Sequence, residues 1–311
     1  MNPTLIGLFA VIVWGMSLPF TRICEEHFGI LAVMGAIFTG SGALGLLNNL
    51  WRRKGSFDRA VFLNPFLYGR GVFFSLHEIL IMSAIVVVRK DNVPIVILIN
   101  YLWPTAIILC SVLLAGVRIM RWWAFGLGSL VVLASLSIEM LGPHGFSGEV
   151  FTDKTDCLAY VMAFVGAISW GLYCALSRRA GEATGGGTVI PFFQLTLALA
   201  LPLSFLPGYA TWENLKGWWY LLLGGYCILQ FLAYLSWDFG MRKGNIVALS
   251  LCADFIPWLS LFTSYLLLGV TLENKTIIAA ISLVAGAMIT RYGTLQKEPF
   301  VVIAKDDLEG A

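Results

Sequence analysis

An apolar run of 25 residues with a proline near its centre occurs twice in the chain. The two copies are Val93–Val117 and Ile246–Val270, and they align without a gap when Arg89 is set against Arg242. At a rise of about 1.5 Å per residue, such a run is long enough as a helix to cross a hydrocarbon core of about 30 Å. The duplication therefore predicts two related membrane-spanning helices, one in each half of the chain.

Pro104 and Pro257 occupy the same position in the two copies. A proline inside a helix removes a backbone hydrogen bond and kinks the helix. In a bilayer the freed carbonyl group has to face protein or a water-filled cavity. Interrupted helices at matching places in two halves are typical of the binding cavities of secondary transporters. We therefore expect both prolines to act as hinges; the alternative is that they have no mechanistic role, since membrane helices often carry proline.

The composition is that of a polytopic membrane protein with no sizeable water-soluble domain. Of the 311 residues, 59 % are apolar and only 12 % are charged, whereas soluble proteins carry about 25 % charged residues. The N-terminus lacks the charged region and cleavage site of a signal peptide, so the first apolar run is expected to be retained as a helix. Apolar runs predict ten transmembrane helices, at Pro3–Phe20, Gly29–Trp51, Pro65–Val88, Val93–Val117, Trp122–Met140, Cys157–Leu176, Val189–Leu206, Trp218–Phe239, Ile246–Val270 and Thr276–Thr290.

A second pair of motifs extends the repeat to the whole chain. Trp14-Gly15 in the first run matches Trp170-Gly171 in the sixth, and an arginine follows each motif. Each repeat then contains five runs. Because five crossings leave the chain on the other side of the membrane, the second repeat starts from the side opposite to the first. We predict an all-α integral membrane protein with ten transmembrane helices in two inverted five-helix repeats. The predicted segments are residues 1–140 and 157–292 for the two repeats, and 293–311 for a polar cytoplasmic tail.

Lysine and arginine predict the orientation. With the N-terminus inside, the inner connections and the tail hold 14 of these residues and the outer connections hold 6. Cytoplasmic connections of membrane proteins carry the excess of positive charge. Both termini are therefore expected in the cytoplasm. Arg70, Arg178 and Arg291 are counted here as residues of the inner connections.

A few ionisable residues interrupt the apolar runs. Glu78, with His77 before it, lies near the middle of the third run, and Asp254 lies three residues before the second central proline. Ionisable groups in lipid are costly and usually face a cavity or a partner. Glu78 can also be explained as a structural pair with His77 or with an arginine, and His77 as a satisfied packing residue. Asp254 can likewise be structural. Asp238 has such an explanation at hand, because Arg242 follows it one helical turn later.

Aromatic residues inside the runs predict the lining of a binding cavity. An aromatic ring offers a flat apolar face, and tyrosine and tryptophan add one hydrogen-bonding tip, which suits a flat apolar solute. No CxxC motif or metal-ligand spacing occurs, so we expect neither a metal nor another cofactor. The predicted lining residues are Tyr101, Trp103, Trp170, Tyr173, Tyr234 and Trp237.

Several motifs resemble those of the drug/metabolite transporter superfamily, EamA type. The resemblance covers Leu5–Arg291. It rests on His77-Glu78-Ile79, Asn100-Tyr101-Leu102-Trp103-Pro104, Trp170 with Tyr173-Cys174, and Trp237 ahead of Gly244-Asn245. Within the superfamily the motifs are similar to those of aromatic amino acid exporters. Asp254 departs from that pattern, because an aromatic residue is expected at its position.

The resemblance implies the export of aromatic and other apolar amino acids across a bacterial inner membrane. It implies a small-molecule substrate and the lipid bilayer as partners, no nucleic acid, and a monomer. Glu78 would meet the substrate ammonium group and Asn100 would bond its carboxylate or amine. Tyr101, Trp103 and Trp237 would hold the substrate side chain.

Two alternatives compete with amino acid export. A membrane enzyme acting on a lipid-linked substrate would usually show clustered acidic or histidine residues at an interface, and none appears in the sequence. A transporter for another metabolite, such as a nucleotide sugar or a drug, would share the repeat. The absence of a basic cavity argues against solutes that carry phosphate.

Overall fold

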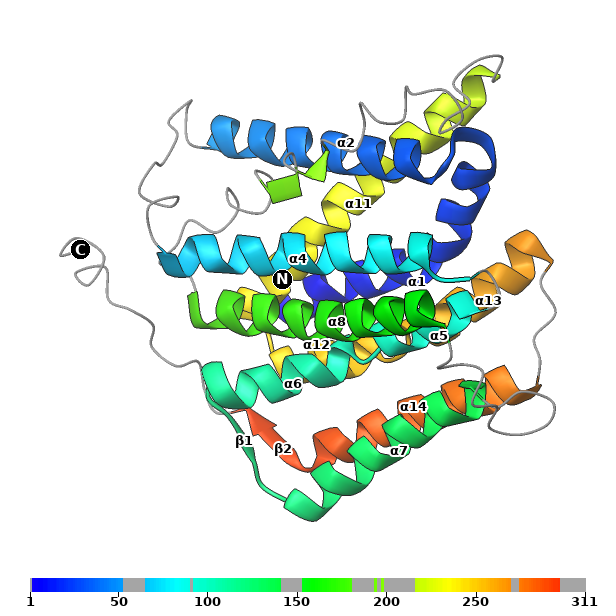
Figure 1. Ribbon diagram of the computed structural model, residues 1–311. Helices are drawn as coiled ribbons and strands as arrows, with labels where there is room; N and C mark the ends of the chain where they lie inside the picture. Colours follow the sequence, from blue (N-terminus) through cyan, green and yellow to red (C-terminus); the bar gives the residue numbers. More distant parts are fainter. Residues whose placement is uncertain are drawn as a thin grey trace.

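The computed structural model describes residues 2–52, 65–89, 92–140, 153–180, 193–194, 197–198, 216–269 and 274–296, and this part of the chain is almost entirely helical (Figure 1). Four segments of it are long and apolar enough to cross a membrane, and a bent helix at the N-terminus makes a fifth if its two arms form one span. The four are Ile30–Trp51, Lys154–Arg179, Gly217–Lys243 and Ile246–Leu267. The prediction of a helical, multi-pass membrane protein is confirmed.

Where the structure describes them, the helices follow the predicted runs within a few residues, except that α1 continues to Phe28, beyond the predicted end at Phe20. The two short strands were not predicted. Up to residue 140 the helices are α1 (Pro3–Phe28), α2 (Ile30–Arg52), α4 (Pro65–Val87), α5 (Val93–Asn100), α6 (Trp103–Leu114) and α7 (Trp122–Met140). Beyond it they are α8 (Lys154–Ala180), α11 (Gly217–Lys243), α12 (Ile246–Ala253), α13 (Ile256–Leu268) and α14 (Asn274–Tyr292). Most of the predicted helix Val189–Leu206 lies outside the described residues.

A short antiparallel ribbon joins two helix ends that are far apart in the sequence. Strand β1 (Val117–Ile119) follows α6, and β2 (Thr294–Gln296) follows α14. Val117 lies opposite Gln296 in this pairing. The segment predicted as a polar tail from residue 293 therefore begins with an ordered strand.

Each of the two proline-containing runs forms two helices rather than one kinked helix. The dipeptide Tyr101-Leu102 separates α5 from α6, and Asp254-Phe255 separates α12 from α13. Pro104 and Pro257 lie in the first turn of the second helix in each case. A proline costs little there, because the first backbone N–H groups of a helix have no intrahelical partner. The break precedes each proline for this reason.

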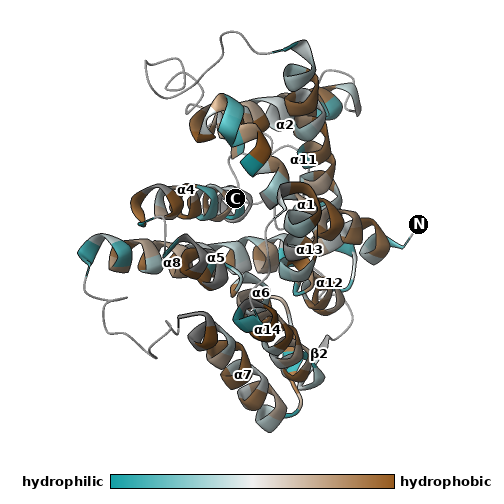
Figure 2. Ribbon diagram, turned by 90° about the vertical axis from the view of Figure 1, so that its right-hand side faces the viewer, coloured by the Kyte–Doolittle hydropathy of each residue, from teal (hydrophilic) through white to brown (hydrophobic). Residues whose placement is uncertain are grey.

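The helices form two bundles and a separate pair (Figure 2). In the first bundle α4, α5 and α6 pack along α8, and in the second bundle α11, α12 and α13 pack along α1, with α2 against α11. The separate pair is α7 and α14, which pack along each other below the bundles in Figure 1. The broken helices thus lie in different bundles, and each packs along one long helix, α8 or α1.

Close packing of α7 against α14 depends on Gly128. A Cβ atom at this position would lie 2.3 Å from the backbone nitrogen of Thr290 and 2.5 Å from the carbonyl oxygen of Gly286. Small residues at such crossings let two helix backbones approach in a membrane, where packing drives helix association. On the same helix, a Cβ atom at Gly126 would meet nothing within 4 Å.

Gly128→Ala is therefore expected to lower the stability of the protein by about 1–3 kcal/mol, the usual cost of overpacking. Thermal unfolding in detergent would show a lower Tm for this variant. Gly126→Ala is the matched control, because it adds the same methyl group to the same helix without a clash. Equal Tm values for Gly128→Ala and the wild type would show that α7 and α14 do not need this close approach.

Candidate substrate-binding site

Seven aromatic side chains meet where the two bundles face each other, and we call them the aromatic cluster. They come from α1, α4, α6, α8 and α11. Trp14 is at the centre, with its ring centroid 5.1 Å from that of Trp237 and 5.6 Å from those of Trp170 and Tyr234. The members are Trp14, Phe74, Trp103, Trp170, Tyr173, Tyr234 and Trp237.

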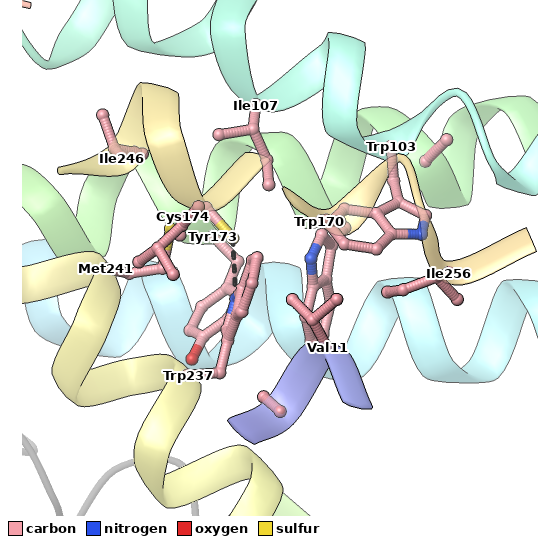
Figure 3. Packing of buried hydrophobic residues seen from close by; sticks show 14 of the residues in the cluster. Val11, Trp103, Ile107, Trp170, Tyr173, Cys174, Trp237, Met241, Ile246 and Ile256 are labelled. Carbon is pink, nitrogen blue, oxygen red and sulfur yellow. Dashed lines mark hydrogen bonds between the residues drawn. The ribbon is translucent and has the colours of Figure 1, made fainter. Parts of the chain in front are cut away.

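The rings of the cluster meet mostly edge to face. Trp103 lies 5.6 Å from Trp237 with an interplanar angle of 84°, and Trp237 donates from Nε1 to Sγ of Cys174 at 3.4 Å (Figure 3). Edge-to-face pairs place the positive rim of one ring against the negative face of another. Aromatic rings that favour such pairs can accept a further ring from a bound solute in the same way.

The structure brings together five of the six aromatic residues that the sequence predicts for the site. The sixth, Tyr101, is buried in the same core, and its hydroxyl group lies 3.4 Å from Oγ of Ser260. Trp14 and Phe74 were not predicted. The match of Trp14 to Trp170 in the repeat could have identified Trp14, and Phe74 lies one turn before Glu78 on the same helix.

Glu78 lies at the edge of the aromatic cluster. Its Oε1 atom accepts a hydrogen bond from the hydroxyl group of Tyr234 at 3.0 Å. This contact joins α4 of the first bundle to α11 of the second. A carboxylate beside aromatic faces is suited to hold an ammonium group, because the charge attraction is strong in a site of low dielectric constant and the ring faces also attract cations.

His77 is buried and already has a hydrogen-bond partner. Its Nδ1 atom lies 2.9 Å from the carbonyl oxygen of Gly166, so Nδ1 carries the proton that the carbonyl accepts. Its ring centroid lies 4.7 Å from that of Trp170. The residue thus fixes the position of Trp170 between α4 and α8.

Two buried polar atoms near the break between α5 and α6 have no hydrogen-bond partner among the described residues. They are Oδ1 of Asn100, which can only accept, and Nε1 of Trp170, which can only donate. Buried polar groups without a partner are rare in proteins and call for an explanation such as a ligand or water. One unused acceptor and one unused donor match the ammonium and carboxylate groups of an amino acid.

Asp254, at the break between α12 and α13, forms an ion pair with Arg291 of α14. Both side chains are buried, and Nε of Arg291 also lies 3.4 Å from Oγ of Ser250. The pairing gives the carboxylate of Asp254 a fixed counter-charge. This pairing is a structural role, and the binding role of Asp254 stays a prediction.

One end of the bundles carries a network of buried arginines, and we call it the arginine-rich end. Asp238 accepts from Nε of Arg242 at 2.8 Å, which confirms the predicted pair, and Nη1 of Arg70 lies 3.8 Å from the same carboxylate. Nη1 of Arg178 donates to the carbonyl oxygens of Arg242 and Gly244 at 3.0 and 2.7 Å. At this end α1 and α4 begin, and α8 and α11 end.

The placement of three arginines in connecting loops was wrong. Arg70, Arg178 and Arg291 lie inside α4, α8 and α14, and all three side chains are buried. Buried charges are tolerated when a partner offsets them. Here carboxylates and helix-terminal carbonyl groups supply that partner.

The opposite end is held by a smaller network around Asp156 of α8. Its carboxylate accepts from the backbone nitrogen of Arg89 at 3.0 Å, from Nε of Arg89 at 2.6 Å and from Nδ2 of Asn92 at 2.7 Å. The hydrogen bond with this carboxylate raises the pKa of Arg89 above its usual value. These contacts tie the segment between α4 and α5 to α8, within the first bundle. In the described part of the chain, no group of three or more His, Cys, Asp or Glu residues is placed to hold a metal ion.

The family and the curated relatives that the sequence matches are membrane transporters. Residues 158–292 match the EamA-like transporter family. The aromatic amino acid exporter YddG of Salmonella typhimurium is 27 % identical over 299 residues, which cover 94 % of this chain and 98 % of the relative. The exporter YddG of Escherichia coli is 26 % identical over 92 % of this chain and 95 % of its own length.

The fold is also that of a solved protein. A crystal structure with 23 % sequence identity superposes with a TM-score of 0.67 and covers 92 % of this chain and 95 % of the solved chain. The chain is thus a helical, multi-pass membrane protein that is similar to the EamA-like transporter family over residues 158–292 and to aromatic amino acid exporters over nearly its whole length.

Proposed function

We propose that this protein is a secondary transporter that exports aromatic and other apolar amino acids by alternating access, and that it is not an enzyme. The observation that carries the proposal is the aromatic cluster with Glu78 at its edge, buried between two bundles of helices. The exporters to which the chain is similar over more than nine tenths of its length support the same function.

We further propose that the chain has ten transmembrane helices in two inverted repeats, residues 1–140 and 157–292. Equivalent glycines support this architecture. A Cβ atom on Gly15 of α1 would meet Leu259 of α13 at 2.4 Å, and one on Gly171 of α8 would meet Ala106 of α6 at 2.7 Å. Leu259 and Ala106 correspond in the aligned runs, so the same close contact occurs once in each bundle.

The two tryptophans before these glycines also have equivalent neighbours. Trp14 donates from Nε1 to Oε1 of Gln230 at 3.2 Å, and the ring of Trp170 lies against that of His77. Gln230 and His77 correspond in the register that aligns the two proline runs. In the same way α1 packs along α11 in one bundle and α8 packs along α4 in the other.

In the proposed complex the substrate bridges the polar groups beside the aromatic cluster. Its ammonium group binds the carboxylate of Glu78 and Oδ1 of Asn100, and its carboxylate accepts from Nε1 of Trp170. Its side chain takes a place among the rings, next to Trp103 and Trp237. The breaks before α6 and α13 act as hinges, since backbone without regular helix can absorb a change of angle.

The arginine-rich end is proposed to face the cytoplasm of a bacterial cell, with both termini on that side of the inner membrane. The excess of Lys and Arg in the connections at that end supports this orientation. A cysteine introduced at the exposed Lys216, at the opposite end, should react with a membrane-impermeant reagent in whole cells. Protection of this cysteine until the cells are opened would contradict the orientation.

Transport by the purified protein in liposomes tests the proposed substrate class. Trp103→Ala is expected to slow the uptake of tryptophan and phenylalanine by about tenfold or more, because an aromatic contact and its buried area contribute over about 1.4 kcal/mol. Uptake of alanine, which leaves the ring positions empty, should change much less. Equal losses for all three amino acids would show that Trp103 only supports packing.

A further inference from the structure

One arginine connects the two bundles at the arginine-rich end. Arg178 extends from α8 of the first bundle to the last turn of α11 in the second bundle, and only 8 % of the residue is exposed. Its Nη1 atom donates to the carbonyl oxygens of Arg242 and Gly244. The last carbonyl groups of a helix have no intrahelical partner and attract cations. The contact therefore ties the two bundles together at this end.

The counterpart of Arg178 in the repeat is Arg22, and it has a different environment. Arg22 follows Trp14 by the same eight residues that separate Arg178 from Trp170. Its side chain is 57 % exposed and pairs with Glu25 at 3.5 Å and Glu26 at 3.2 Å on its own helix. The described ion pairs of Arg22 thus stay within α1, whereas Arg178 reaches the other bundle.

The ends of α4 and α11 share an arginine that pairs with an aspartate, although Asp238 lies on α11 itself and Asp156 lies on α8. Arg89 corresponds to Arg242, and each of these arginines is neutralised by an aspartate, Asp156 in one case and Asp238 in the other. Because the aspartate offsets the charge of the arginine at the helix end, a second arginine can approach the last carbonyl groups of that helix with little repulsion. At the end of α11 this second arginine is Arg178. Its counterpart Arg22 pairs instead with Glu25 and Glu26.

We propose that Arg178 and Arg22 are reciprocal latches of the transport cycle. Arg178 at the arginine-rich end is the inner latch, and it is closed in the structure. Arg22 at the opposite end is the outer latch, and it is open. When the arginine-rich end opens, Arg178 leaves the end of α11, and Arg22 leaves Glu25 and Glu26 to bind the carbonyl groups at the end of α4. This inference rests on the alternating access and inverted repeats proposed above.

The exchange trades the hydrogen bonds of Arg178 at one end of the bundles for hydrogen bonds of Arg22 at the other end. The ion pairs that Arg22 gives up are exposed, and such pairs contribute little to stability. The closed latch gains charge-assisted hydrogen bonds away from water, which are stronger. Removal of either latch should therefore shift the equilibrium between the two states by about tenfold or more.

Distances between spin labels test the proposal on the full chain, in a background without the native cysteines. One pair of labels, at Leu113 and Lys243, reports on the inner end, and another, at Lys154 and Lys216, reports on the outer end; all four side chains are exposed. Arg178→Ala should lengthen the inner distances and shorten the outer ones. Arg22→Ala should shift the populations in the opposite direction.

Three further variants make the result specific. Arg179→Ala removes the same charge from the exposed neighbour of Arg178 and should shift both distances much less than Arg178→Ala does. The double variant Glu25→Gln/Glu26→Gln frees Arg22 and should shift the populations in the same direction as Arg178→Ala. Arg178→Gln keeps a hydrogen-bond donor and serves as the test if the alanine variant does not fold.

The outcomes separate the latches from the transport function. Shifts in the same direction for Arg22→Ala and Arg178→Ala, or no shift for either, would overturn the latches even if the wild type transports tryptophan. Opposite shifts in a protein that does not transport tryptophan would support the latches and contradict the proposed substrate.

Discussion

Glu78→Gln is expected to lower the apparent affinity for aromatic amino acids by about 10- to 100-fold, since a hydrogen bond to a charged group contributes about 1.5–3 kcal/mol. The substitution keeps the shape of the side chain and its capacity to accept from Tyr234, and it removes only the charge. Apparent KM values for tryptophan uptake into proteoliposomes measure the effect.

Two comparisons separate a binding role for Glu78 from a structural one. An analogue of tryptophan without the amino group should bind wild type and Glu78→Gln equally, because it has no ammonium group to lose the attraction. Tyr234→Phe removes the hydrogen bond to Glu78 and keeps the charge, so it should reduce the affinity for tryptophan much less. Normal affinity and normal flux in Glu78→Gln would make Glu78 a structural residue.

Asp238→Ala is expected to destabilise the protein by about 3–5 kcal/mol, the cost of removing one partner of a buried ion pair. Arg70 has a fully buried side chain, and Asp238 supplies the carboxylate that lies beside its guanidinium group. The same carboxylate neutralises Arg242 in the last turn of α11. A large drop in the Tm of the detergent-solubilised protein is the expected result.

The double variant Arg70→Met/Asp238→Leu should be more stable than Asp238→Ala, because it also removes the fully buried charge of Arg70, so that only the less buried Arg242 loses its carboxylate. Glu26→Ala is a matched control at an exposed pair, where both side chains are more than half accessible. It should change stability by less than about 1 kcal/mol. A Tm for Asp238→Ala as high as that for Glu26→Ala would contradict the assigned role of the network.

The sequence predicted the parts of the fold that are local. Hydropathy identifies most helices within a few residues, since an apolar run long enough to cross the membrane is expected to form a transmembrane helix. The positions of Pro104 and Pro257 predicted a disturbance in the right place. The breaks fall before the prolines because the first turn of a helix tolerates a missing N–H group, which the prediction of a simple kink did not consider.

The site was predictable in its residue types and not in its contacts. Aromatic residues deep in apolar runs pointed to the aromatic cluster, whereas the role of Trp14 depends on Gln230, which lies 216 residues away. The buried state of Arg178 likewise depends on carbonyl groups 64 and 66 residues away. Such partners become neighbours only after the helices have packed, so no local pattern in the sequence predicts them.

Tryptophan counterflow in proteoliposomes tests the central proposal most directly. Vesicles containing the purified protein are loaded with unlabelled tryptophan and diluted into a trace of labelled tryptophan. In an alternating-access carrier, the unlabelled tryptophan inside the vesicle competes with labelled tryptophan for the site that faces the interior. Labelled tryptophan that has entered therefore seldom leaves, and it should accumulate transiently above its external concentration. We predict that this accumulation requires tryptophan inside the vesicles. Vesicles loaded with alanine instead should show much less of it. Labelled tryptophan that never exceeds its external concentration, with or without internal tryptophan, would contradict the proposed function.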